Sequence, residues 1–537
     1  MLFGAPNRAD LAECIPAWPL QTLRVRVHRN HGFEAVSSAA RAYAAWNGLD
    51  FEWLVGGYDD SLSFDVTSDA DIEIVWLDTT RLQGLEEEGI VDWLIGRVRA
   101  LRSQTTYPIL VLAWPLSDSD RNRLDDALIP GTYVANIAPL AAALAGRWID
   151  ARAAALSGTR LGNQACLAIA RELACRWLPA LALPPRKAIA VDLDGTLYAG
   201  TLGEDGPAGV ELTQGHRALQ HRLARFRDEG MLLALVSRNE RADVEELFAR
   251  REDFPLRLSD FSAIEVSWDD KSAAVGRIAS ALRIGCDSIV FVDDNPGELA
   301  SVGAALPVVT VHAVPDAKQT ASVLEHVAGM FRWRTSAEDR VRADDLRASE
   351  VRARMEQAAT SQDDYLRGLQ VRLGLLVGPR EHLGRLAELS AKTNQFNLSL
   401  RRMNEAEIAR RVTDAPSNVV AIRLTDRLSD SGIIAMVVGS RVGNALQIDE
   451  LCVSCRALGR RLEDSMLTKA VLVMAGDCAP ERVVFAVRKG PRNAPARDWL
   501  ARYADALVND ETDVVELPFE AVSTHAVSSF IGMEVVR

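Results

Sequence analysis

The sequence predicts a multidomain α/β protein, and three observations support this fold class. Strand and helix patterns alternate from about residue 23 to residue 180, which is typical of a parallel, doubly wound sheet. Between residues 188 and 293, three short apolar runs each end in polar side chains. Beyond residue 366 the pattern becomes that of an α+β domain. A length of 537 residues, 48% of them hydrophobic and 25% charged, suits about three globular domains.

The first domain, predicted over residues 1–180, is expected to be a flavodoxin-like α/β domain. Its segments show the spacing of apolar residues that strands and helices require. Pro184 and Pro185 follow a further helical stretch and mark the boundary with the next domain. The predicted strands are 23–28, 71–78, 108–115 and 132–138, and the predicted helices are 36–46 and 91–103.

Charge and cysteine content exclude several function classes. A net charge of −13 and a pI near 5.3 argue against nonspecific binding of nucleic acid or of anionic membranes. No apolar run reaches the roughly 18 residues of a membrane span, and the first residues do not resemble a secretory signal. Seven scattered cysteines predict reduced thiols and a cytoplasmic location. We therefore expect no nucleic-acid partner, no membrane partner and no disulfides.

Two aspartates follow the apolar run 188–191 and enter a turn opened by Gly195. Alternate side chains of a strand face the same way, so Asp192 and Asp194 leave the strand end together. Such a pair can share a cation and one phosphoryl group, with one carboxylate attacking phosphorus while the other handles a proton. Acidic turns after strands are common on protein surfaces, so this motif is weak evidence by itself.

Three further motifs follow in order. Ser237 ends a second apolar strand, where a hydroxyl can bond a phosphoryl oxygen, and Asn239 lies just beyond it. Lys271 precedes a helical pattern and offers a cation that neutralises charge on a transferring phosphoryl group. A third strand ends in Asp293 and Asp294, paired carboxylates of the kind that Mg²⁺ prefers. Taken singly, these features also fit a helix cap, a surface charge and a turn.

Together and in this order, the four motifs resemble those of the haloacid dehalogenase (HAD) superfamily. The resemblance implies a Rossmann-like phosphatase domain, predicted over residues 181–317. Asp192 would be the nucleophile and Asp194 the general acid/base. Ser237 and Lys271 would clamp the phosphoryl group, with Asn239 as a substrate ligand. The implied cofactor is Mg²⁺, and its implied ligands are Asp192, Asp194, Asp293 and Asp294.

Two further expectations concern architecture. The gaps between the motifs leave no room for a separate cap domain, which needs on the order of 50 residues, so we expect a site open to large or tethered substrates. The charged stretch 318–365 carries acid and base pairs at helical spacing and is predicted to be a helical linker. We interpret its charges as a solvated face without a catalytic role.

The last domain, predicted over residues 366–537, contains strings that are more specific than the acidic motif. They are AKTNQFNLSLRRM from Ala391, RLTDRLSDSGIIA from Arg423, ELCVSCRALGRRLEDSML from Glu450 and NAPARDWL from Asn493. The predicted strands are 369–378, an antiparallel pair at 418–427 and 432–440, and 482–490, with helices at 382–394 and 493–503 and a strand leading into a helix over 444–461.

These strings, with LGEDG at residues 202–206, resemble the FkbH-like proteins over nearly the whole chain from about Ala188. Members of that family use D-1,3-bisphosphoglycerate to load a glyceryl group onto an acyl carrier protein and remove the phosphates. The resemblance implies an acyl carrier protein as partner, its phosphopantetheine arm as acceptor, and a phosphorylated three-carbon acyl phosphate as substrate. It also implies a role in polyketide-type biosynthesis.

The string SCRALGR indicates a second reactive site. In GNAT-type acyltransferases a strand leads into a helix whose first turn binds pyrophosphate, and Arg456, Gly459 and Arg461 occupy those positions. An arginine at position 461, where Gly or Ala is usual, suits a phosphopantetheine phosphate or a phosphoglyceryl group better than CoA. Cys455, expected at the helix N-terminus, is a candidate nucleophile for a glyceryl thioester, and burial in the core is the alternative. Cys452 is expected to be core.

Further polar residues have weaker roles. Asn394, Gln395 and Asn397 could bond substrate hydroxyls, although an Asn-rich helix end also serves as a cap. His28 and His31 are expected on the surface and not as a metal pair.

The N-terminal domain resembles the SGNH-hydrolase-like module attached to some FkbH-like proteins. It lacks the Gly-Asp-Ser turn and the late Asp-x-x-His of that module, so we predict a scaffold or carrier-docking role.

The sequence thus predicts a glyceryl transferase and phosphatase. Two enzymatic alternatives stay open: a stand-alone Mg²⁺-dependent HAD phosphatase, and a CoA-dependent acyltransferase with a regulatory HAD domain. A non-enzymatic scaffold is an alternative for residues 1–180 alone.

Overall fold

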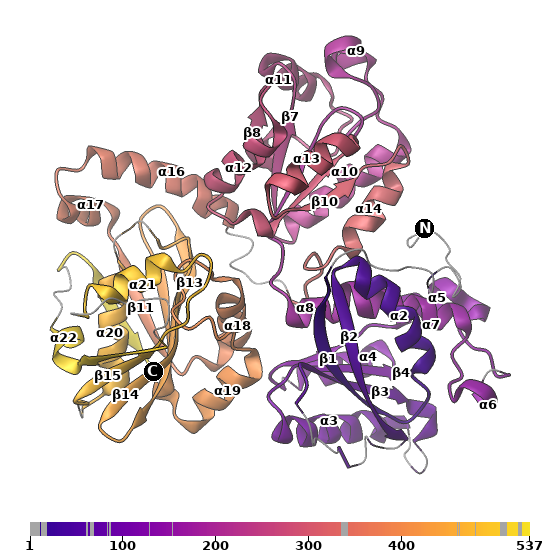
Figure 1. Cartoon of the computed structure of the whole chain (residues 1–537), viewed down its shortest axis with the longest axis horizontal. Helices are drawn as coiled ribbons and strands as arrows, with labels where there is room; N and C mark the ends of the chain where they lie inside the picture. The colour runs from indigo at the N-terminus through magenta and orange to yellow at the C-terminus, as the bar shows by residue number, and fades with distance from the viewer. Residues whose placement is uncertain are drawn as a thin grey trace. The chain divides into compact units, whose positions relative to one another are not determined.

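The computed structural model describes most of the chain as helices and strands, and it confirms the multidomain α/β fold class (Figure 1). The chain divides into two compact units, Met1–Arg186 with Lys318–Arg334, and Lys187–Ala317 with Thr335–Arg537. Within the described residues, no helix is both long and apolar enough to cross a membrane. The described residues are 11, 19–58, 60, 63–64, 69–82, 84, 87–127, 129–152, 154–334, 342–458, 460, 462–477, 479–504, 513–524 and 529–537.

The first unit is built on a five-stranded parallel sheet of order β2-β1-β3-β4-β5, the order of flavodoxin-like folds. Helices α2 and α7 pack on one face of this sheet, and α3 and α4 pack on the other. Strand β2 was missed in the sequence, although the alternation of apolar and polar residues at its start is the pattern of a half-buried edge strand. The bounds are β1 (Gln21–Arg29), α2 (Glu34–Trp46), β2 (Leu49–Tyr58), β3 (Ile72–Asp78), α3 (Glu87–Gln104), β4 (Ile109–Trp114), α4 (Asp118–Asp126), β5 (Thr132–Val134), α5 (Ala138–Leu144), α6 (Ala154–Ser157), α7 (Asn163–Glu172) and α8 (Pro179–Ala182).

Helix α14 (Ala317–His326) returns to this first unit, so the linker predicted over residues 318–365 is wrong in its first part. His326 Nε2 lies 3.2 Å from Glu172 Oε1, and the Asn47 side chain donates to the His326 carbonyl at 3.1 Å. Phe331 and Trp333 pack against the core of the unit. These apolar residues, rather than the charges that follow them, decide where the segment lies.

The structure also corrects the expectation that His28 and His31 are exposed. His28 is fully buried, with Nδ1 2.6 Å from Asp60 Oδ2 and Nε2 3.1 Å from Glu73 Oε2. His31 stacks on Trp76 at a ring-centroid distance of 4.6 Å, and burial lowers its pKa to about 3. Both rings therefore belong to the interior of the first unit.

The second unit begins with a five-stranded parallel sheet of order β10-β9-β6-β7-β8. Helices α12 and α13 pack on one face. The order places β6 between β9 and β7, which is the switch point where ligands bind in such sheets. The bounds are β6 (Ala188–Val191), α9 (Leu202–Gly209), α10 (Gln214–Asp228), β7 (Leu232–Ser237), α11 (Arg241–Arg250), β8 (Phe261–Val266), α12 (Lys271–Ala281), β9 (Ile289–Asp293), α13 (Pro296–Ala305) and β10 (Val309–His312).

The short connections of this sheet leave its carboxyl edge uncovered by a further domain. Between β6 and α10 the chain forms α9 and an isolated bridge between Ala199 and Glu211. Between β7 and α12 it forms the helix α11 and then β8, which is the edge strand of the sheet. Both stretches are described throughout, and neither contains a separate cap domain.

The C-terminal part of the second unit is a mixed sheet of order β16-β15-β14-β13-β12-β11-β17. The predicted pair β12 and β13 is antiparallel, as expected. Helices α18 and α19 pack on one face, and α17, α20 and α21 pack on the other. The bounds are α16 (Arg342–Ala358), α17 (Gln362–Leu369), β11 (Arg372–Val377), α18 (Leu383–Lys392), α19 (Glu405–Asp414), β12 (Val419–Thr425), β13 (Asp430–Val442), β14 (Ala445–Val453), α20 (Glu463–Ala475), β15 (Arg482–Ala486), α21 (Ala494–Ala501), β16 (Val514–Pro518), α22 (Phe519–Ser523) and β17 (Gly532–Val536).

Candidate active site

The predicted acidic residues meet at the carboxyl ends of β6 and β9. Asp192 follows β6, and its backbone N–H donates to the Val292 carbonyl at 3.0 Å, which fixes it beside the neighbouring strand. Asp293 ends β9 and Asp294 follows it. Each of these three aspartates offers an oxygen within 4.8 Å of the others. The structure therefore brings together three of the four predicted metal ligands.

Lys271, the first residue of α12, supplies the counter-charge. It is buried, and its Nζ lies 3.0 Å from Asp192 Oδ1 and 2.6 Å from Asp293 Oδ2. Burial lowers the pKa of Lys271, but the two carboxylates outweigh burial and raise it, so the lysine stays charged. Ser237 ends β7 on the other side of β6, as the motif predicts.

Three carboxylates around one ammonium leave an excess of negative charge. Burial raises the pKa of Asp192 to about 7 against the pull of Lys271, and Asp293 adds to the rise. Burial and Asp293 also raise the pKa of Asp294. A divalent cation would relieve this repulsion, and a set of oxygen ligands suits Mg²⁺. The residues present therefore fit the implied cofactor.

The carboxylate of Asp194 lies outside this cluster, in contrast to the predicted metal set. Its Oδ1 accepts hydrogen bonds from the Tyr198 hydroxyl at 2.7 Å and the Leu202 backbone N–H at 2.9 Å. Its Oδ2 accepts a hydrogen bond from Asn239 Nδ2 at 2.8 Å. Both oxygens are thus held by the chain's own donors. The carboxylate still lines the same cavity as Asp192, in a position suited to proton transfer.

Asn239 has a different role from the predicted one. Its buried amide donates to Asp194 and, at 2.9 Å, to Ser237 Oγ, so it positions these two residues instead of binding substrate. Tyr198 was not singled out in the sequence, although it stands four positions after Asp194 in the same motif.

Gly195 is required by the close approach of Asp294. Its φ is +67°, and a Cβ at this position would lie 2.3 Å from Asp294 Oδ2. The turn that carries Asp194 can therefore pass directly against the second acidic motif.

The acidic cluster opens into a cavity of about 410 Å³, in the usual range for small-molecule sites. Two residues in its wall, Arg238 and Glu298, had no role in the sequence prediction. Asp192, Asp194, Lys271 and Asp294 line the same cavity.

The second predicted site lies in the turn that follows β14. Cys455 is half-buried in this turn, and α20 begins only at Glu463, so the predicted position at a helix N-terminus is wrong. Cys455 lines a cavity of about 660 Å³ together with Gln395 and Leu458. Asn394 and Gln395 line a smaller cavity of about 150 Å³ that also reaches Cys455.

The structure describes only some of the other predicted site residues in the SCRALGR string. Arg456 lies in the same turn as Cys455 and is half-buried. Gly459 and Arg461 lie outside the described residues. Cys452 is fully buried in the core, as predicted, and burial with the nearby Glu450 raises its pKa well above the usual value.

A segment of the chain fills the gap between two diverging strands. β14 pairs with β15 only over Ala445–Ile448, and the strands then separate. Residues 396–398 lie in the gap, with Leu398 N donating to Leu451 O at 3.1 Å and Arg488 N donating to Leu398 O at 2.8 Å. On the β14 side, Val453 N also donates to Phe396 O at 2.8 Å.

This arrangement contradicts the prediction that Asn397 binds substrate. Asn397 is fully buried, its Nδ2 donates to Glu450 Oε1 at 2.9 Å, and its Oδ1 accepts from Leu400 N at 2.8 Å. The Asn397 side chain therefore holds the segment in place, whereas Asn394 and Gln395 face cavities next to Cys455.

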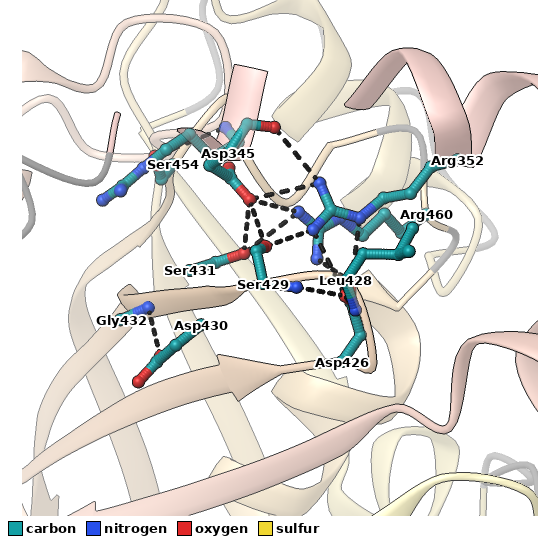
Figure 2. A network of polar contacts seen from close by, with 11 residues as sticks. Asp345, Arg352, Asp426, Leu428, Ser429, Asp430, Ser431, Gly432, Ser454 and Arg460 are labelled. Carbon is teal, nitrogen blue, oxygen red and sulfur yellow. Dashed lines mark hydrogen bonds and ion pairs between the residues drawn. The ribbon is translucent and has the colours of Figure 1, made fainter. Parts of the chain in front are cut away.

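Figure 2 shows a buried network of charges around Arg460, which lies five positions after Cys455. Arg352 of α16 lies 2.8 Å from Asp426 and 3.1 Å from Asp345. Arg460 lies 3.1 Å from Asp426 and 3.4 Å from Asp345. The four side chains are each at most 5% exposed, and their charges cancel. The hydroxyls of Ser429 and Ser431 donate to Asp345 at 2.7 and 2.9 Å.

Comparison with known proteins adds information about the fold. No family model matches this chain, and no curated protein matches it. Among solved structures, the N-terminal part of the protein BF1531 from Bacteroides fragilis, containing a phosphatase domain and complexed with Mg, is 19% identical with a TM-score of 0.50. The likeness covers 62% of this chain and 100% of that chain, and it supports the fold described above.

Two weaker likenesses have TM-scores too low to carry an argument. An uncharacterized protein from Corynebacterium glutamicum is 17% identical, over 26% of this chain and 94% of that chain, with a TM-score of 0.20. A spermidine N-acetyltransferase SpeG mutant from Vibrio cholerae is 11% identical, over 28% of this chain and 96% of that chain, with a TM-score of 0.21.

Replacing Asp426 with alanine should destabilise the C-terminal sheet by about 3 kcal/mol, because two buried arginines then share a single carboxylate. Hydrogen exchange of the β12 and β13 amides measures this loss. Asp414→Ala, which removes an exposed acid of α19, is the matched control and should change stability by less than about 0.5 kcal/mol. Equal exchange in the two variants would show that the network contributes nothing.

The affinity for Mg²⁺ should fall as the pH is lowered below 7. Binding requires the ionised form of Asp192, whose pKa in the free site is about 7, so a proton competes with the cation at lower pH. Titration calorimetry should show the dissociation constant rising by up to about tenfold per pH unit. Asp192→Asn should weaken binding and flatten this dependence, whereas the exposed control Glu252→Gln should not. A constant affinity between pH 6 and 8 would contradict the assignment.

Proposed function

We propose that this chain is an enzyme with two sites, a Mg²⁺-dependent phosphatase and an acyl-transfer site at Cys455. Together they would load a glyceryl group from D-1,3-bisphosphoglycerate onto an acyl carrier protein and remove phosphate. The observation that carries the proposal is the gathering of Asp192, Asp293 and Asp294 around Lys271, with Asp194 held separately in the same cavity.

The phosphatase site divides its chemistry between two aspartates. An oxygen of Asp192 attacks phosphorus, the bond from phosphorus to the leaving oxygen breaks, and Asp194 gives that oxygen a proton. Asp194 then takes a proton from water, which attacks the aspartyl phosphate and releases Asp192 and phosphate. Lys271 and Ser237 hold the phosphoryl oxygens. Mg²⁺ held by Asp192, Asp293 and Asp294 would neutralise charge on those oxygens.

The open edge of the sheet supports a tethered substrate. The connections after β6 and β7 form no cap, so a substrate on a carrier arm has room to approach. This supports the proposal of a carrier-bound glyceryl phosphate as the phosphatase substrate.

The acyl-transfer step would use Cys455. Its thiolate attacks the carbonyl of the acyl phosphate, the carbon–sulfur bond forms, and phosphate leaves. The thiolate of the phosphopantetheine arm then attacks this thioester and takes the phosphoglyceryl group, which restores Cys455. The phosphatase site would then remove the remaining phosphate. The cavity of about 660 Å³ beside Cys455 has room for such an arm, and Asn394 and Gln395 offer amides to substrate hydroxyls.

The alternative of a CoA-dependent acyltransferase has less support. The gap between β14 and β15 could otherwise accept an extended arm, but residues 396–398 fill it and satisfy its backbone groups. A stand-alone phosphatase is the second candidate, because the acidic cluster is complete without Cys455.

For residues 1–180 we propose a scaffold or carrier-docking role. For the whole chain we propose a cytoplasmic location and a role in polyketide-type biosynthesis, as its resemblance to FkbH-like proteins implies.

Asp192→Asn should lower the hydrolysis of p-nitrophenyl phosphate by at least about a thousandfold, because the variant lacks the nucleophile. The release of p-nitrophenol in the presence of Mg²⁺ measures this rate. Glu252→Gln, an exposed acid of the same domain, should keep the full rate. If Asp192→Asn keeps more than a tenth of the rate, a different residue attacks phosphorus.

Cys455→Ala should prevent both a covalent glyceryl adduct and transfer to pantetheine, used here as a small acceptor. Intact mass spectrometry after incubation with D-1,3-bisphosphoglycerate detects both products. Cys286→Ala removes the other half-buried thiol that lines the same cavity and should still form the adduct, because Cys455 is the nucleophile. Asp192→Asn should still form the adduct, which keeps its 3-phosphate, because the substitution changes only the phosphatase site. An adduct on Cys455→Ala would refute the thioester assignment.

A further inference from the structure

An ion pair lies in the wall of the phosphatase cavity. Arg238 directly follows β7, and Glu298 lies in the first turn of α13, with Arg238 Nη1 2.7 Å from Glu298 Oε1. In the sheet, β7 and β9 lie on opposite sides of β6, and α13 follows β9. Because β6 carries Asp192, the pair joins the two walls of the cleft on either side of the nucleophile. Both residues line the cavity of about 410 Å³.

Among the described residues, two cationic side chains line this cavity, Lys271 and Arg238, and they differ in how firmly their charges are paired. Lys271 is buried between two carboxylates of the metal cluster. The Arg238 side chain is 38% exposed and has one short ionic contact, to Glu298. Its other contacts are long, 3.5 Å to Asp270 Oδ1 and 3.4 Å to the Asp269 carbonyl. Arg238 is therefore able to exchange its partner, whereas Lys271 is not.

The cavity is larger than a phosphoryl group requires, so the remainder of a small substrate can lie between the acidic cluster and Arg238. A guanidinium binds a carboxylate or a phosphate through two parallel N–H groups. We propose that Arg238 determines the specificity of this site by exchanging Glu298 for a second anionic group of the substrate. The substrate class is a phosphate monoester with a second anionic group, which is either a carboxylate or a second phosphate such as that of a phosphopantetheine arm. This inference rests on the proposed phosphatase function.

The test compares two substrates that differ in one group, using the full chain with Mg²⁺. 3-Phosphoglycerate carries a carboxylate where glycerol 3-phosphate carries a hydroxymethyl group. The wild type should favour 3-phosphoglycerate by about tenfold to a hundredfold in kcat/KM, because a charged hydrogen bond is made with one substrate only. Arg238→Ala should bring this ratio close to one, and Arg238→Lys should restore part of it.

Two further variants sharpen the test. Glu298→Gln removes the competing carboxylate, so KM for 3-phosphoglycerate should fall. Arg241→Ala removes an exposed arginine of α11 that pairs with Glu245, and it should leave the ratio unchanged. A wild-type ratio of one, or a ratio that Arg238→Ala does not change, would overturn the proposal.

A third substrate, p-nitrophenyl phosphate, separates this proposal from the proposed function. If the wild type hydrolyses p-nitrophenyl phosphate but its substrate ratio does not depend on Arg238, the specificity proposal alone fails. If the wild type hydrolyses none of the three esters, the phosphatase function fails, and the specificity proposal fails with it.

Discussion

The repulsion between carboxylates at one edge of a parallel sheet is the constraint on which the second unit depends. The strand order places β6 beside β9, so Asp192 and Asp293 must meet where their strands end. Lys271 compensates one charge only, and the burial of Asp192 and Asp293 keeps water from screening the repulsion between them. The raised pKa of Asp192 is the direct result of this arrangement. The fold thus gathers negative charge that a bound cation would neutralise.

The same edge gives two aspartates, two positions apart in sequence, opposite environments. Asp192 faces an ammonium and other carboxylates, whereas Asp194 accepts hydrogen bonds from neutral donors, including Tyr198 and Asn239. This difference comes from the residues around the two aspartates, and not from the Asp-x-Asp spacing itself.

The sequence predicted those parts of the site that depend on local order along the chain. Asp192 and Asp293 were predictable because each follows an apolar strand, and parallel strands end at one edge. The burial of Asn397 was not predictable, because it depends on Glu450, which lies 53 positions away. The role of Arg460 depends on Asp345, which lies 115 positions away. A sequence pattern identifies a polar residue but not the distant charge that it will meet.

Helix α16, which was predicted to be part of a solvated linker, is the clearest example of charged residues whose distant partners the sequence does not reveal. Arg352 and Asp345 of α16 point inward and pair with Arg460 and Asp426, so this helix is part of the C-terminal domain (Figure 2). The paired charges restrain the turn that carries Cys455, five positions before Arg460, where the predicted helix is absent. Cys455 itself is only half-buried. The buried ions beside it supply the rigidity, and the thiol remains open to the cavity.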